Sequence, residues 1–199
     1  MKPLQEPLCA KTRVAGTAAA LSALAARSSA AEPPKKVADV LAKLPADDYK
    51  AAGELCTALL DAGPAVIKEL VNLVGDEFGD PNGAKPKYAL HGLVHYASRP
   101  GAEASRAMLA ETLAGELSAE HSEELKAFIV RQLQWCGRTQ EIPALAKLLS
   151  SDRLCNPATQ ALVAIGGPSA LKALRDALPA AEGPRQVAIS QAVELLSRK

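Results

Sequence analysis

The sequence of 199 residues is poor in aromatic side chains. Phe, Trp and Tyr make up only 3% of the chain, whereas hydrophobic residues make up 48%, so a core must be built mainly from Ala, Leu, Val and Ile. These residues suit close packing of helix on helix, and β-sandwiches depend more on aromatic and β-branched residues. The composition therefore predicts an all-α protein.

The sequence also lacks clusters of like charge. It holds 23 Lys and Arg against 22 Asp and Glu, a formal net charge of +1, spread along the chain. Nucleic-acid binders usually carry a basic stripe, and polybasic membrane anchors need several adjacent Lys or Arg residues. We therefore expect neither a nucleic-acid partner nor a polybasic membrane contact.

Signatures of the common catalytic sites are missing as well. The sequence contains no G-x-S-x-G, no P-loop and no dinucleotide fingerprint. Its Ser and Asp residues fall at predicted caps and turns, where helix physics accounts for them. We expect a protein that is not an enzyme and that needs no cofactor.

The N-terminal residues 1–31 differ from the rest of the chain. Basic residues at the start, an uncharged stretch over 14–26 and the small residues Ser29-Ala30-Ala31 resemble a secretory signal peptide. We predict cleavage before Glu32 and export to the periplasm or the extracellular space, with no membrane insertion afterwards. An organellar transit peptide or a cytosolic tail are the alternatives, and the last of these would leave the protein cytoplasmic.

Three cysteines, Cys56, Cys136 and Cys155, would remain after cleavage, and none belongs to a C-x-x-C pair. Cys56 and Cys136 fall on apolar helical stripes, so the simplest interpretation is buried, small hydrophobic side chains. One disulfide and one free thiol is the alternative. Structural zinc is disfavoured.

Apolar residues recur at helical offsets of 0, 3, 4 and 7, as in residues 142–149. Asp47 or Asp48, and later Ser122, stand where helix N-caps are expected. Helical hairpins of this size cannot bury their apolar stripes alone, so several must stack into one core. The expected organisation is a linker with a short leading helix over 32–45, then a repeat domain over 46–199 with hairpins at 46–74, 85–117, 121–150 and 151–178 and a closing helix at 184–198.

Two segments, 63–70 and 167–174, share the form Gly-Pro-x-x-apolar-Lys-x-Leu. On this motif the chain resembles the HEAT-like repeat family, best over residues 125–178, and looks like the HEAT-repeat regions of exported bacterial proteins. The resemblance implies an α-solenoid of about four hairpins that binds other macromolecules, and it carries no catalytic residues with it. We therefore predict a non-catalytic interaction module or scaffold for a protein or peptide.

One polar group lies on the helix predicted over 85–98. Tyr88, His91, His95 and Arg99 share one face, because their offsets of 0, 3, 7 and 11 align at about 100° per residue. The group is a recognition surface, a solvated stripe or structural contact between repeats, or a metal site built on the two histidines. The last interpretation needs a third ligand that the sequence does not identify, and it would make the protein an accessory subunit that holds a metal or cofactor for a larger exported enzyme. The charge of the histidines would change near about pH 6 to 7.

A second group, Gln132, Gln134, Trp135 and Arg138, ends the next leading helix. Gln132 lies among apolar positions, so we expect it to bond the backbone of a neighbouring turn. We expect Trp135 in the core or between repeats, with a partner-binding anchor as the alternative.

The trailing helices of the hairpins carry a mixed-charge face that could form a binding surface for a protein or peptide. Its members are Lys68, Glu69, Arg106, Glu111, Lys147, Lys172 and Arg175.

The turn-rich segment 75–83 carries oxygen-bearing side chains, but its spacing does not match an EF-hand loop. A solvated loop is the default interpretation, and calcium is the alternative.

Overall fold

The computed structural model describes residues 37–75 and 81–198, and all regular secondary structure in these ranges is helical. The leader predicted over 1–31, the start of the linker and most of the segment 75–83 lie outside the described residues. The chain divides into two units, Met1–Glu32 and Pro33–Lys199, and every described residue belongs to the second. The predicted all-α fold is confirmed.

The α-helices are α1 (Val37–Ala42), α2 (Tyr49–Asp61), α3 (Pro64–Val74), α4 (Ala84–Ala97), α5 (Glu103–Glu116), α6 (Glu123–Cys136), α7 (Ile142–Ala146), α8 (Cys155–Ile165), α9 (Gly167–Ala177) and α10 (Gly183–Ser197). The short 3₁₀ segments are η1 (Pro81–Gly83), η2 (Thr139–Glu141), η3 (Lys147–Ser150) and η4 (Leu178–Ala180).

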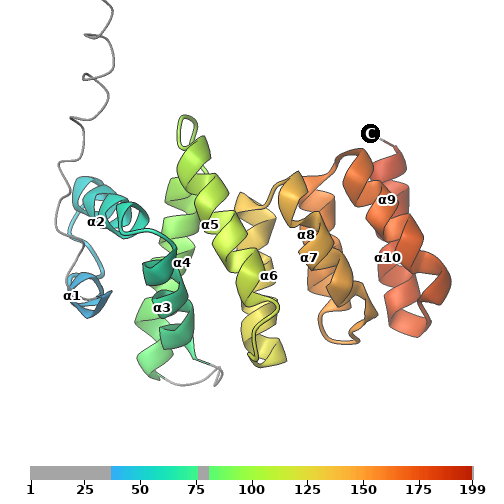
Figure 1. Ribbon diagram of the computed structural model, residues 1–199, viewed down its shortest axis with the longest axis horizontal. Coiled ribbons are helices and arrows are strands. Elements are labelled where there is room, and N and C mark those ends of the chain that lie inside the picture. Colours follow the sequence, from blue (N-terminus) through green and yellow to red (C-terminus); the bar gives the residue numbers. More distant parts are fainter. Residues whose placement is uncertain (1–36, 76–80, 199) are drawn as a thin grey trace, which may run out of the picture. The chain divides into compact units, whose positions relative to one another are not determined.

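The helices of the second unit form two layers and follow one another in chain order (Figure 1). The even-numbered helices form one layer, in which α2 contacts α4, α4 contacts α6, α6 contacts α8 and α8 contacts α10. The helices α3, α5, α7 and α9 form the other layer in the same way. Contacts thus join near neighbours in the chain, as stacked helical hairpins require. The superhelical, HEAT-like character of this array stays a prediction.

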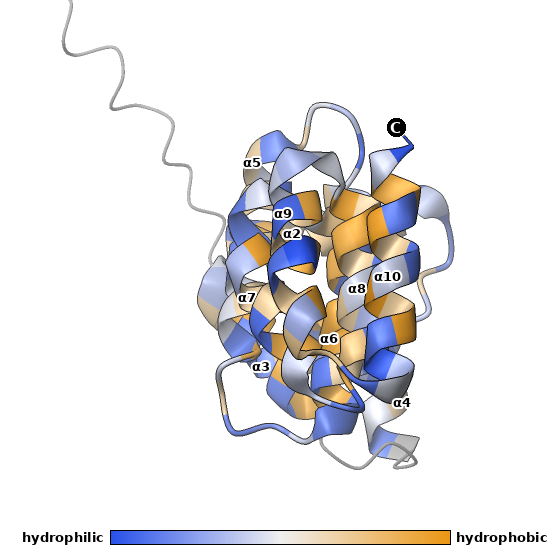
Figure 2. Ribbon diagram, turned by 90° about the vertical axis from the view of Figure 1, so that its right-hand side faces the viewer, coloured by the Kyte–Doolittle hydropathy of each residue, from blue (hydrophilic) through white to orange (hydrophobic). Residues whose placement is uncertain are grey.

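The core lies between the two layers and is aliphatic. Among the described residues, the buried hydrophobic side chains are Leu, Ile, Val, Ala and Cys, and no Phe, Tyr or Trp is buried. Burying one Leu or Ile side chain contributes about 2 kcal/mol. At the C-terminal end, α10 carries hydrophobic and hydrophilic segments (Figure 2), with Ile189, Ala192 and Leu196 buried while Val187 and Leu195 are exposed.

The local sequence determines where two of the helices begin. The side chain of Asp48 accepts a hydrogen bond from the Ala51 amide at 2.8 Å, and the Ser122 hydroxyl accepts one from Leu125 at 3.2 Å. Both predicted N-caps are thus confirmed, and each contributes about 1 kcal/mol.

The Gly-Pro motif has a conformational reason in both of its copies. Gly63 and Gly167 have φ angles of 83° and 78°, a region that glycine adopts without strain. The proline that follows each glycine lies in the first turn of α3 or α9, where its missing N–H costs nothing.

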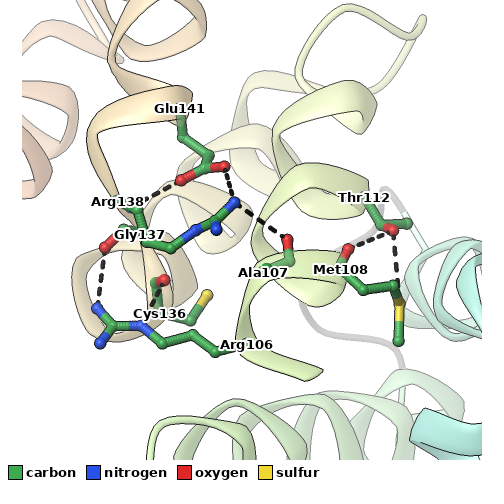
Figure 3. A network of polar contacts seen from close by, with 8 residues as sticks. All are labelled: Arg106, Ala107, Met108, Thr112, Cys136, Gly137, Arg138 and Glu141. Carbon is green, nitrogen blue, oxygen red and sulfur yellow. Dashed lines mark hydrogen bonds and ion pairs between the residues drawn. The ribbon is translucent and has the colours of Figure 1, made fainter. Parts of the chain in front are cut away.

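The junction between hairpins at the end of α6 is held by polar contacts (Figure 3). Arg106 of α5 donates from Nε to the Cys136 carbonyl at 2.9 Å and from Nη2 to the Gly137 carbonyl at 3.0 Å. These carbonyls at a helix end have no partner within the helix, so the guanidinium satisfies two of them at once.

A second arginine, Arg138, also connects the segment after α6 to α5. Arg138 donates from Nη2 to the Ala107 carbonyl at 3.4 Å and to Glu141 Oε1 at 3.1 Å (Figure 3). The Glu141 side chain is 2% exposed and also accepts the Arg138 amide at 2.7 Å. The carboxylate is therefore buried with a charged partner, which removes the cost of an isolated buried charge.

Gly137 leaves no room for a side chain at this junction. A Cβ placed there would lie 2.4 Å from the Leu133 carbonyl oxygen and 2.9 Å from Ile165 Cδ1 of α8. We expect Gly137→Ala to lower the free energy of unfolding by about 1–3 kcal/mol, because the backbone and α8 must move apart. Urea titration followed by circular dichroism measures this.

Gly92→Ala is the matched control. Gly92 lies inside α4, and a Cβ there meets no atom within 4 Å. We expect this change to raise the free energy of unfolding by about 0.5–1 kcal/mol, because alanine favours the helix. Equal effects of the two substitutions would contradict the close approach at Gly137.

Candidate functional site

The histidines of α4 lie together on its exposed side. His91 Nε2 and His95 Nε2 are 3.2 Å apart, and the ring centroids are 4.5 Å apart with the rings nearly perpendicular. His91 Nδ1 lies 3.1 Å from Gln132 Oε1 of α6. With the amide oxygen of Gln132 as acceptor, His91 carries its proton on Nδ1, and its Nε2 accepts from His95 Nε2–H.

Gln132 is 4% exposed, and its Nε2 donates to the Phe128 carbonyl at 3.4 Å. The predicted bond to the backbone of a neighbouring turn is confirmed. The contact with His91 was not predicted, because it joins residues 41 positions apart in the chain. Gln132 thus connects the core side of α6 to the histidine pair.

Trp135 completes the cluster from α6. Its ring is tilted against His95 with centroids 4.7 Å apart, and Ser98 Oγ donates to the Trp135 carbonyl at 3.3 Å. The residue is 56% exposed and packs against the neighbouring hairpin, so of the two places expected for it, the core and the contact between repeats, the second is the one observed. Trp135 leaves about half of its surface open.

Arg99 and Tyr88, the two other members of the group predicted on α4, contact different neighbours. Arg99 donates to the Tyr96 carbonyl at 2.5 Å, and its guanidinium carbon lies 3.5 Å from the centroid of the Tyr96 ring. The Tyr96 hydroxyl in turn bonds Thr57 Oγ1 of α2 at 2.8 Å. Tyr88 is 59% exposed and borders a pocket. The pattern therefore identified the exposed face correctly but not the grouping.

The pocket lies between α1, the loop before α2, α2 and α4, and it has a volume of about 340 Å³. Its walls are mostly aliphatic, and Asp47, Asp48, Tyr49, Tyr88 and His91 carry polar groups to its lining. Among the described residues that line it, none is Lys or Arg. A further lining residue is Cys56, so the pocket, the histidine pair and one thiol share a single region.

The predicted mixed-charge face is largely engaged within the chain. Arg106 bonds the end of α6, as described above, and Lys172 pairs with Asp176 at 2.5 Å. Arg175 donates to Ser197 Oγ at 3.2 Å, and Lys147 is exposed. The bonds of Arg106 and Arg175 to other helices were not readable from the helical pattern, whereas Lys172 and Asp176 are an i, i+4 pair that helical spacing allows.

A second buried carboxylate, besides Glu141, was not predicted from the sequence. Glu116 at the end of α5 is 8% exposed, lies 3.0 Å from His121 Nε2 and 3.5 Å from Lys68 Nζ of α3. His121 follows Glu116 by five residues across the turn that leaves α5, and that spacing was the available signal. The contacts are structural: His121 bonds the buried carboxylate and Lys68 places a positive charge beside it.

Cys56, Cys136 and Cys155 are free thiols. Cys136 and Cys155 are buried as expected, whereas Cys56 is half-buried at the pocket. Burial raises the pKa of all three thiols, and it raises the pKa of Cys136 to about 12 against the opposing effect of Arg106. The buried thiols are therefore unreactive.

Residues 37–75 and 81–198 contain no cluster of metal ligands and no membrane-spanning helix. No group of three or more His, Cys, Asp or Glu residues there is placed to hold a metal ion, so the third ligand required by the accessory-subunit hypothesis is not found in this part of the chain. None of the described helices is long and apolar enough to cross a membrane.

Comparison with known proteins returned no matching family model, no matching curated protein and no matching solved structure.

The free thiols allow a direct test of the packing between α6 and α8. A pKa of about 12 lowers the thiolate fraction of Cys136 at pH 8 by roughly a thousandfold, so we expect iodoacetamide to modify Cys56 well before Cys136. Peptide mapping by mass spectrometry measures the rate at each cysteine, and a sample in urea shows that all react once unfolded. Equal rates for Cys56 and Cys136 in native buffer would contradict this packing.

Proposed function

We propose that this chain is a non-catalytic, HEAT-like interaction module that binds a protein or peptide through the face of its even-numbered helices. One observation carries the proposal: an apolar pocket of about 340 Å³ opens beside Tyr49 and Tyr88, which are 100% and 59% exposed. Export remains part of the proposal and depends on the leader expected over residues 1–31.

The size and lining of the pocket favour a bulky side chain as its occupant. Its volume lies at the lower end of the range for ligand sites, about 300–1,000 Å³. The walls, which include Val40, Leu44 and Leu55, provide the hydrophobic contact. Tyrosine and tryptophan are enriched among the residues that dominate binding at interfaces, and Tyr88 and Trp135 are both exposed on this side.

The charge at the pocket favours a basic residue next to that anchor. Asp47 and Asp48 contribute carboxylates to the lining, and the described lining residues include no cation. Opposite charges improve specificity and speed of association more than affinity. The preferred partner is thus a segment with an aliphatic or aromatic anchor and a neighbouring Lys or Arg.

The face of odd-numbered helices is a weaker candidate. The contacts of Arg106, Lys172 and Arg175 described above satisfy these cations within the chain, so a partner would have to compete for them. The even-numbered helices offer apolar surface, and none of the intrachain contacts described above would compete with a partner for it.

Peptide selection tests the proposal. Peptides that bind the full-length chain are selected from a random library, and their affinity is measured by calorimetry. We expect an aliphatic or aromatic anchor with an adjacent Lys or Arg, and we expect Tyr88→Ala to weaken binding at least about tenfold, because an aromatic contact at the rim is lost.

Lys172→Ala on the opposite layer is the matched control and should leave affinity within about twofold. The reverse result, with loss on Lys172→Ala and none on Tyr88→Ala, would move the binding site to the odd-numbered helices. Failure to select any peptide would contradict a peptide-binding module.

A further inference from the structure

We propose that His91 and His95 form a two-ligand site for a divalent transition-metal ion, with Cu²⁺ preferred. This inference goes beyond peptide binding and does not depend on it. It stands on the placement of two imidazole nitrogens and of the amide that holds one of them.

The separation of the two nitrogens suits a shared ion. Imidazole nitrogens bind such ions at about 2.0–2.1 Å, so two of them in adjacent positions, at angles of about 90–110°, lie about 2.8–3.4 Å apart. His91 Nε2 and His95 Nε2 are 3.2 Å apart. Both residues belong to α4 and are one turn apart, the same i, i+4 spacing that holds zinc in H-E-x-x-H helices.

Gln132 supplies the outer support that metal-binding histidines usually have. A ligating imidazole almost always donates its other N–H to an acceptor, which sets the tautomer and orients the ring. His91 Nδ1 bonds Gln132 Oε1 at 3.1 Å, and the Gln132 side chain is itself buried and bonded to the Phe128 carbonyl. His91 Nε2 therefore presents a lone pair in a fixed direction.

Metal binding requires two changes at His95. Its proton must leave Nε2, where it bonds His91, and move to Nδ1, and its ring must turn so that the two Nε2 lone pairs converge on the ion instead of pointing at each other. His95 is exposed, so the proton can exchange through water. Neutral imidazoles lose no proton overall, whereas protonated ones must release theirs, so the affinity falls in acid.

Two protein ligands leave coordination positions for water or for a group from a partner. No third His, Cys, Asp or Glu joins the pair within the described ranges, which disfavours a closed structural zinc site. Affinity for a given nitrogen site rises from Ni²⁺ to Cu²⁺ and falls again at Zn²⁺. The nearby cation Arg99 is turned onto the Tyr96 ring.

Trp135 provides the readout, because it is the only tryptophan of the chain and its ring centroid lies 4.7 Å from that of His95. CuCl₂ and, separately, NiCl₂ are titrated into the full-length protein at pH 7.5 in a buffer that binds metals weakly. We expect saturable quenching of Trp135 fluorescence at one ion per chain, with tighter binding of Cu²⁺. Ni²⁺ does not oxidise thiols and so checks for effects of the free cysteines.

Substitutions assign the quenching to the pair. His91→Ala and His95→Ala should each weaken Cu²⁺ binding at least about tenfold, because a chelating pair becomes a single ligand. Gln132→Leu should weaken it about tenfold through loss of the outer acceptor, whereas Gln132→Glu should retain binding. His121→Asn, which removes a histidine held by Glu116, is the matched control and should bind as the wild type does.

Circular dichroism verifies that each variant is folded, and electron paramagnetic resonance of the Cu²⁺ complex reports whether two nitrogens coordinate the ion. Quenching that survives in the His91→Ala/His95→Ala double variant would overturn the proposal, as would quenching that appears only in large metal excess. His95 does not line the pocket, so His95→Ala can abolish metal binding while peptide binding through Tyr88 in metal-free buffer stays intact, and the two proposals can fail separately.

Discussion

Three consecutive hairpins meet at Gly137, where the space beside the backbone is too small for any side chain. The Leu133 carbonyl and Ile165 of α8 occupy the space that a Cβ would need. Arg106 reaches the same point from α5 and satisfies two carbonyls at the end of α6. The spacing of α6 between its neighbours is therefore set by the contact of Gly137 with the Ile165 side chain on one side and by the Arg106 guanidinium on the other, and both tolerate little change.

The position of α6 in turn determines the candidate site. With Ile129 and Leu133 buried in the core, the helical repeat turns Gln132 towards α4 and leaves Trp135 at the surface. Gln132 then meets His91, and Trp135 meets His95. A rotation of α6 would separate both contacts together, so the site shares its geometric origin with the hydrophobic core.

Sequence reasoning succeeded where the decisive interactions are local. Apolar periodicity located the helices, and the caps at Asp48 and Ser122 followed from residues three positions apart. It failed where partners come from other hairpins: periodicity showed that His91 is exposed, but not that Gln132 lies opposite it. For Trp135 the pattern left the core and the contact between repeats both open, and only the structure shows that it packs on His95 of the neighbouring hairpin. The contacts within the odd-numbered face were not predicted for the same reason, since nothing local shows that Arg106 bonds the end of α6.

His91 belongs to both proposed sites, and this sharing has a thermodynamic consequence. It lines the pocket on one side and bonds Gln132 and His95 on the other. A partner side chain in the pocket that displaces the His91 ring would weaken metal binding, and one that supplies a further ligand would strengthen it. Linkage requires the metal to change the affinity for that partner by the same factor. Because the ring is held by Gln132 from the core, a coupling of either sign would act through His91 without rearrangement of the helices.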